Sequence, residues 1–208
     1  MPTVTLLKPQ KNGKRVNVYM DGIFGFGIDL DTLVLNHIKI GTELTDYEVK
    51  KIIRKAEFQK TLDKLLRFVT LRPRSQKEVN DYLKRKKVHE SLYESLIDKL
   101  KHFELLDDAK FAKWWVEQRI AFKKISSRVL KLELGRKGVD KNIIDTVLEE
   151  NPFDEKKMAR DLLQKRAYKW ENLDPKVAKQ KKFQYLAGKG FSWEIITELL
   201  KSDMSTSE

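Results

Sequence analysis

Three stretches of the chain repeat one another: LKRKKV at 83–88, LGRKGV at 134–139 and LAGKGF at 186–191. They begin 51 and then 52 residues apart. Nine, ten, thirteen and fourteen positions after each leucine the chain has apolar or aromatic residues, and these spacings place them on one face of a helix. These residues are Leu92, Tyr93, Leu96, Ile97, Ile143, Ile144, Val147, Leu148, Ile195, Ile196, Leu199 and Leu200. The pattern predicts a repeat protein in which every unit ends in an amphipathic helix.

The residues between each leucine and the apolar stripe predict a turn that joins two helices. Gly138 and Gly190 can adopt the left-handed conformation that commonly ends a helix. Asp140 and Ser192 follow them and suit the N-cap of the next helix. These four residues are therefore interpreted as structural caps.

The first unit departs from this pattern, because Lys87 stands in place of the glycine and His89 in place of the cap. The first turn is therefore expected to differ from the other two. Two more helices are expected ahead of the turn in each unit. The ones directly before it are predicted at 75–86, 126–137 and 175–189. The ones before those are predicted at 59–71, 108–122 and 154–170.

Residues 1–29 have a different pattern, with short β-rich runs at 3–8, 16–20 and 23–28. Asp21-Gly22 between the last two runs favours a type I′ hairpin, because both central residues of that turn need a positive φ. Asn12-Gly13 is a second turn signal. Three antiparallel strands are predicted, and because such a sheet is marginal alone, it is expected to pack on a helix. This β-unit is interpreted as a structural cap.

A long helix is expected to follow the β-unit. Thr45 precedes Glu48 by three residues, which is the spacing of a capping box. The helix can run past Phe58, and Arg72-Pro73 is a stop signal because the residue before proline avoids the helical region.

The predicted fold is therefore mainly α, with three tandem three-helix repeats in an elongated curved array after a small N-terminal antiparallel β-unit. The connections that this requires are short enough for compact packing. The expected parts are the β-unit with its helix at 1–57, the repeats at 58–107, 108–153 and 154–201, and a disordered tail at 202–208.

Positive charge is concentrated in the second half of the chain. The whole sequence has 43 Lys and Arg against 31 Asp and Glu, a net charge of +12. Residues 110–137 and 155–190 each have a net charge of +7, whereas 138–154 and 191–208 have −4 and −3. Single lysines usually do no more than solvate a helix, but two separate basic blocks favour a surface that faces a polyanion.

The two blocks supply the candidate contact residues. In the first block they are Arg119, Lys123, Lys124, Arg128, Lys131, Arg136 and Lys137. In the second block they are Arg160, Lys165, Arg166, Lys169, Lys179, Lys181 and Lys182. These residues are expected to face DNA or an acidic protein surface.

Catalysis and cofactor binding are not expected. The absence of cysteine excludes a disulfide framework, a Cys-ligated zinc site, an iron–sulfur cluster and a thiol nucleophile. His37, His89 and His102 share no ligand spacing, and Asp107-Asp108 is better interpreted as a helix cap than as an acid–base pair or metal site. No apolar run of about 18 residues and no signal-peptide pattern occur, so a cytoplasmic protein is expected.

Aromatic residues gather at 111–122. Phe111, Trp115 and Phe122 keep a helical spacing and are interpreted as core. Trp114 lies off that stripe and could stack on a base or, as the favoured alternative, pack against a neighbouring unit. The glycine turn is also compatible with a helix-turn-helix, but Asn142 is the only good base-reading candidate, so sequence-specific duplex reading is disfavoured.

Several motifs resemble those of one known family. The stretches are RPRSQKEV at 72–79, LDDAKFA at 106–112 with Trp115 and Arg119 after it, and LKLELGRKGV at 130–139. Over about residues 58–200 the chain resembles the bacterial RecX family of recombination regulators. The NVYMDG hairpin at 17–22 resembles the N-terminal extension of longer members.

This resemblance implies a modular all-α array and a regulator without catalytic residues. The implied partner is the RecA recombinase with its nucleoprotein filament, whose strand exchange and ATP hydrolysis the protein would dampen from the filament groove. Many members also bind DNA. A monomer with no cofactor and no membrane contact is expected, and several weak contacts along a groove would add up through avidity.

Two other classes stay open from the residues alone. A general DNA-binding helical-repeat module would bind DNA without recombinase, with an affinity that falls steeply as salt rises. A structural adaptor would bind an unrelated protein. An enzyme is the least favoured class, because the sequence has no constellation of base, nucleophile or metal ligands.

Overall fold

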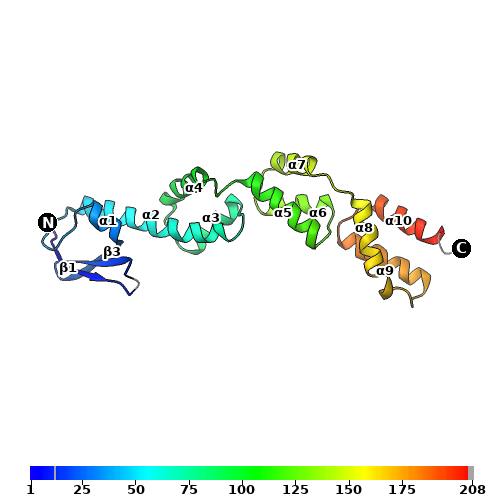
Figure 1. Ribbon diagram of the computed structural model, residues 1–208, viewed down its shortest axis with the longest axis horizontal. Helices are drawn as coiled ribbons and strands as arrows, with labels where there is room; N and C mark the ends of the chain where they lie inside the picture. The colour runs from blue at the N-terminus through cyan, green and yellow to red at the C-terminus, as the bar shows by residue number, and fades with distance from the viewer. Residues whose placement is uncertain (12, 206–208) are drawn as a thin grey trace. The chain divides into compact units, whose positions relative to one another are not determined.

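The structure is a computed structural model that describes residues 1–11 and 13–205 (Figure 1). A three-stranded antiparallel sheet with the order β1-β2-β3 precedes a series of helices. The strands are β1 Val4–Pro9, β2 Arg15–Met20 and β3 Ile23–Asp29. The helices are α1 Leu30–Leu35, α2 Asp46–Thr70, α3 Gln76–Arg85, α4 Tyr93–His102, α5 Asp108–Phe122, α6 Ser127–Arg136, α7 Lys141–Glu150, α8 Glu155–Lys165, α9 Pro175–Gly188 and α10 Trp193–Ser205. The predicted fold class is confirmed in its β-unit and its helical repeats.

The chain divides into two compact units. The first contains residues 1–71 and 88–98, and the second contains 72–87 and the residues from 99 onward. The second unit includes the complete helix sets α5–α7 and α8–α10.

The sheet has the predicted hairpins. Asp21 and Gly22 have φ values of 49° and 81°, as a type I′ turn requires. Gly13 has a φ of 64°, while its neighbour Asn12 lies outside the described residues. Val18 on β2 pairs with Phe26 on β3, and both are buried. Ile52 and Ala56 of α2 belong to the same apolar cluster, so α2 is the helix on which the sheet packs.

Helix α2 begins with the predicted capping box. The Thr45 hydroxyl accepts from the Glu48 N–H at 3.2 Å, and the Glu48 carboxylate accepts from the Thr45 N–H at 2.8 Å. The helix then continues for 25 residues to Thr70, just ahead of Arg72-Pro73. The predicted boundary between residues 57 and 58 lies inside this uninterrupted helix. One helix therefore supplies both the support of the sheet and the first helix of repeat one.

The last repeat differs from the prediction at two places. Helix α8 ends at Lys165 and a 3-10 turn, Ala167–Lys169, follows it, so the predicted helix at 154–170 is broken. Helix α10 continues to Ser205, which makes the start of the expected tail at 202–208 helical. Residues 201–205 contain neither glycine nor proline to stop the helix. Residues 206–208 lie outside the described part of the chain.

The core clusters of the second unit follow the predicted stripes, with one exception. Phe111 is fully buried with Leu130, Leu134 and Val147. Phe122, however, is 80% exposed, so its interpretation as core is wrong. Phe122 is the last residue of α5, and the buried Ile125 after the helix belongs to the core cluster instead.

Each of the three repeat turns contains one residue with a positive φ. Gly138 and Gly190 have φ values of 79° and 85°, as predicted. Lys87 has a φ of 53°, so the expectation that the first turn would differ is wrong at this residue. His89 is the N-cap of the 3-10 turn that follows, because its Nδ1 accepts from the Ser91 N–H at 3.3 Å. The positive φ is therefore repeated where the glycine is missing, but a 3-10 turn, Glu90–Leu92, precedes α4, and in this respect the first turn differs as expected.

Replacing Lys87 by glycine is expected to stabilise the protein. A side chain in the left-handed region costs about 1–2 kcal/mol, of which the greater entropy of glycine in the unfolded chain cancels about 0.5–1 kcal/mol. We expect Lys87→Gly to raise the free energy of unfolding by about 0.5–1 kcal/mol in urea titrations. Lys86→Gly is the matched control, because Lys86 has a φ of −84° and gains nothing from glycine. Equal or lower stability of Lys87→Gly than of Lys86→Gly would contradict this account of the turn.

Candidate functional site

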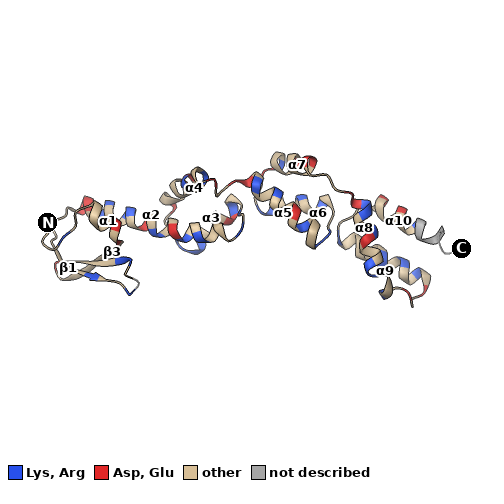
Figure 2. Ribbon diagram, viewed as in Figure 1, with Lys and Arg blue, Asp and Glu red and all other residues tan. Residues whose placement is uncertain are grey.

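The candidate surface consists of the predicted basic residues on the leading helices of repeats two and three. Figure 2 shows Lys and Arg over α5, α6, α8 and α9. The structure separates these residues into some that are engaged in structural contacts and some that extend into solvent.

Four of the candidate residues of the first block form salt bridges. The pairs are Arg119 with Glu133 at 2.6 Å, Lys124 with Asp161 at 3.0 Å, Lys131 with Asp145 at 2.6 Å, and Lys137 with Glu78 at 2.6 Å. Their side chains are half-buried or partly exposed, and a partner carboxylate offsets each positive charge. These four residues therefore contribute less to an anion-binding surface than their number suggests.

Trp115 is the centre of one such structural contact. The Arg119 guanidinium lies 4.1 Å from the centroid of the Trp115 ring, and the Lys137 ammonium lies 5.0 Å from it. Glu133 accepts from both the Trp115 indole N–H at 2.8 Å and Arg119 Nε at 2.6 Å. Residues 115 and 119 are one helical turn apart, so the tryptophan–arginine spacing builds a cation–π contact on α5.

Trp114 also packs within the protein. It is half-buried, its ring lies 6.2 Å from that of Phe111, and the Arg72 guanidinium lies 5.5 Å from its centroid. Two roles were predicted for Trp114, base stacking and packing. These contacts correspond to packing, here against the segment that precedes α3.

The remaining candidate residues of the first block are exposed. Lys123, Arg128 and Arg136 form no salt bridge with any residue that the structure describes. Their exposed side chains are available to an external anion.

Most of the second block is exposed as well. Exposed side chains occur at Arg160, Lys165, Arg166, Lys169, Lys179 and Lys181, and Lys182 is half-buried. The Arg166 guanidinium lies 4.5 Å from the Tyr185 ring centroid, and the Lys169 ammonium lies 5.8 Å from that of Tyr168. Tyr168 is itself 66% exposed, so an aromatic ring accompanies this group of cations.

The predicted caps lie at helix ends. The Asp107 carboxylate accepts from the backbone N–H groups of Ala109 and Lys110 at 2.8 and 3.1 Å. Asp140 accepts from the Asn142 N–H at 2.8 Å, and the Ser192 hydroxyl accepts from the Ile195 N–H at 3.3 Å. These carboxylates and hydroxyls satisfy backbone donors.

Asp108 has a different role from its neighbour. Its carboxylate accepts from the Gln76 N–H at 2.8 Å, so it caps α3 of the preceding repeat. Burial raises the pKa of Asp108, although the hydrogen bond from Gln76 and the charge of Lys101 lower it in part. Glu155 of α8 caps α6 in the same way, because its carboxylate accepts from the Ser127 N–H at 2.9 Å. The acidic start of each first helix therefore caps the second helix of the repeat before it.

Two buried serines complete these junctions. The Ser75 hydroxyl donates to the Lys137 carbonyl and the Ser126 hydroxyl donates to the Gly190 carbonyl, both at 2.7 Å. Each acceptor belongs to the glycine turn of the following repeat. Sequence reasoning gave Ser75, Ser126 and Glu155 no such role, although the two serines occupy equivalent positions 51 residues apart.

Glu78, in the first of these junctions, forms an ion pair with a residue of the first basic block. It pairs with Arg72 at 3.0 Å and with Lys137 at 2.6 Å, and 14% of its side chain is exposed. Burial raises the pKa of Glu78, but the hydrogen bonds and charges of Arg72 and Lys137 outweigh this effect and lower the pKa. The carboxylate is thus held charged in the folded protein.

The lowered pKa predicts how stability depends on acid. A carboxyl whose pKa is lower in the folded state contributes stability above its unfolded pKa, about 4.5 here, and loses that contribution as the pH falls through the folded pKa. We expect Glu78→Gln to lower the free energy of unfolding at pH 7 by about 2–3 kcal/mol. The difference from the unsubstituted protein should shrink below pH 4.5. A difference that stays constant between pH 7 and pH 3 would contradict the role of this charge.

Among the residues that the structure describes, no group of three His, Asp or Glu side chains is placed to hold a metal ion. A search of the same residues finds no helix long and apolar enough to cross a membrane.

Comparison with known families finds four matching models along the chain. The model described as "Regulatory protein RecX N-terminal domain" matches residues 2–45. Those described as the first, second and third three-helix domains of RecX match residues 62–100, 107–148 and 154–200.

Curated proteins and solved structures give consistent matches. The chain is 34% identical over 203 residues to "Regulatory protein RecX" of Bacillus pumilus, covering 97% of this chain and 77% of the relative. It is 28% identical over 209 residues to the protein of that name from Clostridium beijerinckii, covering 99% and 97%. A solved structure titled "Crystal structure of regulatory protein RecX" matches with a TM-score of 0.71 at 24% identity, over 97% of this chain and 100% of that one. A second, from Lactobacillus salivarius, has a TM-score of 0.62 at 26% identity over 72% and 97%.

Proposed function

The chain belongs to the RecX family of regulatory proteins, and from this membership we propose that it binds the RecA recombinase and its nucleoprotein filament. In this proposal the protein acts as a monomeric, non-catalytic regulator in the cytoplasm and inhibits ATP hydrolysis and strand exchange by the filament.

The observation that supports the proposal most strongly is the exposed part of the two basic blocks. Lys123, Arg128 and Arg136 in repeat two are exposed, as are most of the predicted cations of repeat three. A recombinase filament on DNA is a long polyanion, and clustered cations promote encounter with such a partner. Each contact at an exposed charge is weak, so binding would depend on several contacts made together.

The ion-paired cations have a supporting role in this proposal. Arg119 and Lys137 enclose Trp115, and Lys137 also pairs with Glu78. These residues keep α5 and α6 in place and thereby position the exposed side chains near them. They are proposed as structural members of the surface and not as its anion contacts.

A binding experiment can test the proposal. Recombinase filaments assembled on single-stranded DNA with a non-hydrolysable ATP analogue are sedimented with the protein, and naked DNA of the same length is the control. We expect the protein to pellet with the filament at concentrations at which it leaves naked DNA largely unbound. Equal binding to filament and naked DNA would contradict recognition of the recombinase.

The alternative function is a general DNA-binding module with salt-dependent phosphate contacts. The exposed lysines and arginines of both blocks favour it. In that case binding would not need recombinase, and log affinity would fall linearly with log salt, with a slope of about −0.7 for each phosphate contacted on single strands. A flat salt response would exclude this alternative.

A further inference from the structure

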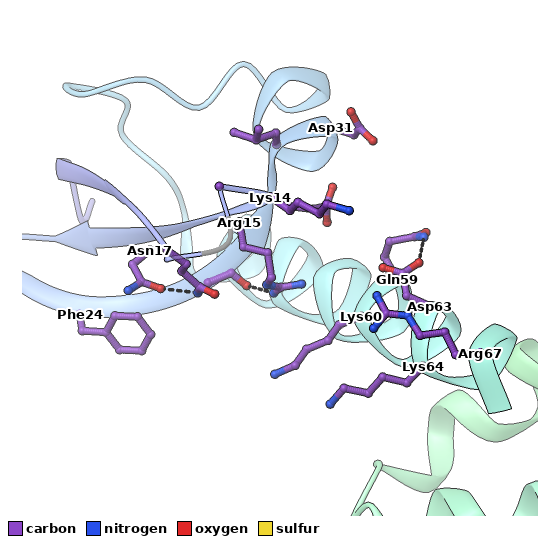
Figure 3. Close-up of a pocket in the computed structure, with 15 residues that line it drawn as sticks. Lys14, Arg15, Asn17, Phe24, Asp31, Gln59, Lys60, Asp63, Lys64 and Arg67 are labelled. Atoms are coloured by element: carbon purple, nitrogen blue, oxygen red, sulfur yellow. Dashed lines mark hydrogen bonds between the residues drawn. The ribbon is translucent and has the colours of Figure 1, made fainter.

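An open cleft lies in the first compact unit, which contains neither of the basic blocks of repeats two and three. It has a volume of about 780 Å³ and lies between the sheet and helix α2 (Figure 3). The loop before β2 and the strands β2 and β3 line one side, and the second half of α2 lines the other. The expected cap role of the β-unit does not account for this cleft.

The lining of the cleft has more basic than acidic residues. It contains five basic residues: Lys14, Arg15, Lys60, Lys64 and Arg67. The last three recur at spacings of four and three residues, so they lie on one face of α2. At 1.5 Å per residue they extend along the helix for about 10 Å. Figure 3 shows Lys60 and Lys64 extending from α2 in the same direction.

Two of the three carboxylates in the lining are engaged locally. Asp29 accepts from the N–H and the hydroxyl of Thr32 at 2.8 and 2.9 Å, so it serves as the N-cap of α1. Asp63 accepts from the Gln59 amide at 2.9 Å. The third, Asp31, lies in α1 across the cleft from Lys60 and Lys64 (Figure 3). The lining as a whole has five cationic side chains against three carboxylates, so its net charge is +2.

An exposed aromatic ring lies at the other side of the cleft. Phe24 on β3 is 55% exposed, although phenylalanine is normally buried. Its ring makes an edge-to-face contact with Tyr19, with centroids 5.9 Å apart and an interplanar angle of 78°. This contact restrains the ring. A restrained, exposed ring on a sheet is a platform on which an unpaired base can stack.

Hydrogen bonds within the β-unit fix the floor between the ring and the helix. Arg15 donates from Nη2 to the Gly27 carbonyl at 2.6 Å, which holds its guanidinium inside the cleft. Gln10 donates to the Asn17 side-chain carbonyl at 2.6 Å. A side chain at residue 27 would crowd these amides, because a Cβ there would lie 3.0 Å from Gln10 Nε2. Because glycine has no side chain, it leaves the space beside the Gln10 and Asn17 amides open to the cleft.

We propose that this cleft binds a short stretch of single-stranded nucleic acid. The phosphates would lie along Lys60, Lys64 and Arg67, and one base would stack on Phe24. A row of cations beside an exposed aromatic ring is the arrangement that single-strand binders use. A duplex keeps its base faces stacked inside, so it could use the cations but not the ring. The proposal does not depend on recombinase binding, because it concerns the β-unit and a ligand that carries no recombinase.

Fluorescence anisotropy with labelled 20-nucleotide oligo-dT and oligo-U tests the cleft in the full chain without recombinase. The DNA and RNA arms identify which strand the cleft prefers. We expect the Lys60→Gln, Arg67→Gln double variant to bind the preferred strand about tenfold or more weakly at 0.1 M salt and to reduce the salt slope by about 1.4. The matched control is Lys51→Gln with Lys55→Gln, which removes two exposed charges from the same helix outside the cleft.

The aromatic ring is tested separately. Phe24→Ala is expected to weaken binding about tenfold without changing the salt slope, and Phe24→Tyr is expected to restore affinity because tyrosine keeps a stacking face. Circular dichroism confirms that each variant is folded. Equal loss in the cleft and control double variants, or affinity unchanged in Phe24→Ala, would overturn the proposal, as would the absence of binding to both oligonucleotides by the unsubstituted chain.

Discussion

Replacing Gly190 by alanine is expected to destabilise the second compact unit by about 2–5 kcal/mol. Two effects add up at this residue. Its φ of +85° costs a side chain about 1–2 kcal/mol. A Cβ there would also overlap Val129 Cγ2 and lie 2.7 Å from Ser126 Oγ, and overpacking of this kind costs about 1–3 kcal/mol. Because Ser126 donates to the Gly190 carbonyl, the change also disturbs the hydrogen bond that joins repeats two and three.

Urea titration followed by tryptophan fluorescence measures this loss. All four tryptophans belong to the second unit: Trp114, Trp115, Trp170 and Trp193. The matched control is Gly188→Ala, two residues earlier, where φ is not positive and nothing lies within 4 Å of a new Cβ. This control is expected to be neutral or to stabilise by up to about 1 kcal/mol, because alanine is the better helix former.

A double variant separates the two effects at Gly190. Val129→Ala removes the methyl group that the new Cβ would meet, so the double variant should lose about 1 kcal/mol less than the sum of the single variants. A free energy of unfolding for Gly190→Ala within about 0.5 kcal/mol of the unsubstituted protein would contradict the close approach at this turn.

Reversing three exposed charges in repeat two is expected to raise the concentration needed for half-maximal inhibition of the recombinase about tenfold or more. The triple variant is Lys123→Glu, Arg128→Glu and Arg136→Glu. These side chains form no salt bridge among the described residues, so their reversal should leave the fold intact. A tenfold change corresponds to about 1.4 kcal/mol, a modest sum for three charges that would meet a polyanion.

The matched control reverses the same amount of charge elsewhere. Lys50, Lys51 and Lys55 are exposed on α2, outside both basic blocks and the N-terminal cleft. Their triple reversal to glutamate is expected to change inhibition by less than about threefold, because exposed charges outside the contact surface are screened by salt and contribute little. Equal effects of both triple variants would indicate that net charge alone, and not this surface, determines inhibition.

The repeat architecture was largely predictable because its signals are local. The capping box at Thr45, the glycine turns at Gly138 and Gly190, and the caps of the following helices all depend on residues within a few positions of one another. Lys87 shows where local reasoning stops. The surrounding turn keeps it in the left-handed region although its residue type disfavours that conformation.

The candidate surface was predictable in composition but not in detail. Lys137 and Glu78 are 59 residues apart in the chain, so their ion pair could not be inferred from a charge count along the sequence. The same holds for Lys124 with Asp161. Phe122 has a helical spacing typical of core, yet it is exposed because it lies at the very end of α5. Partners distant in sequence decide which of the predicted cations remain available.

The most direct test of the proposed function is steady-state ATP hydrolysis by RecA filaments on single-stranded DNA, titrated with the folded chain at low salt. We expect ATP hydrolysis to fall as the protein is added, with inhibition nearly complete at or below one molecule per recombinase subunit. Hydrolysis that stays unchanged at a several-fold excess of folded protein would contradict the proposal that this chain regulates the recombinase filament.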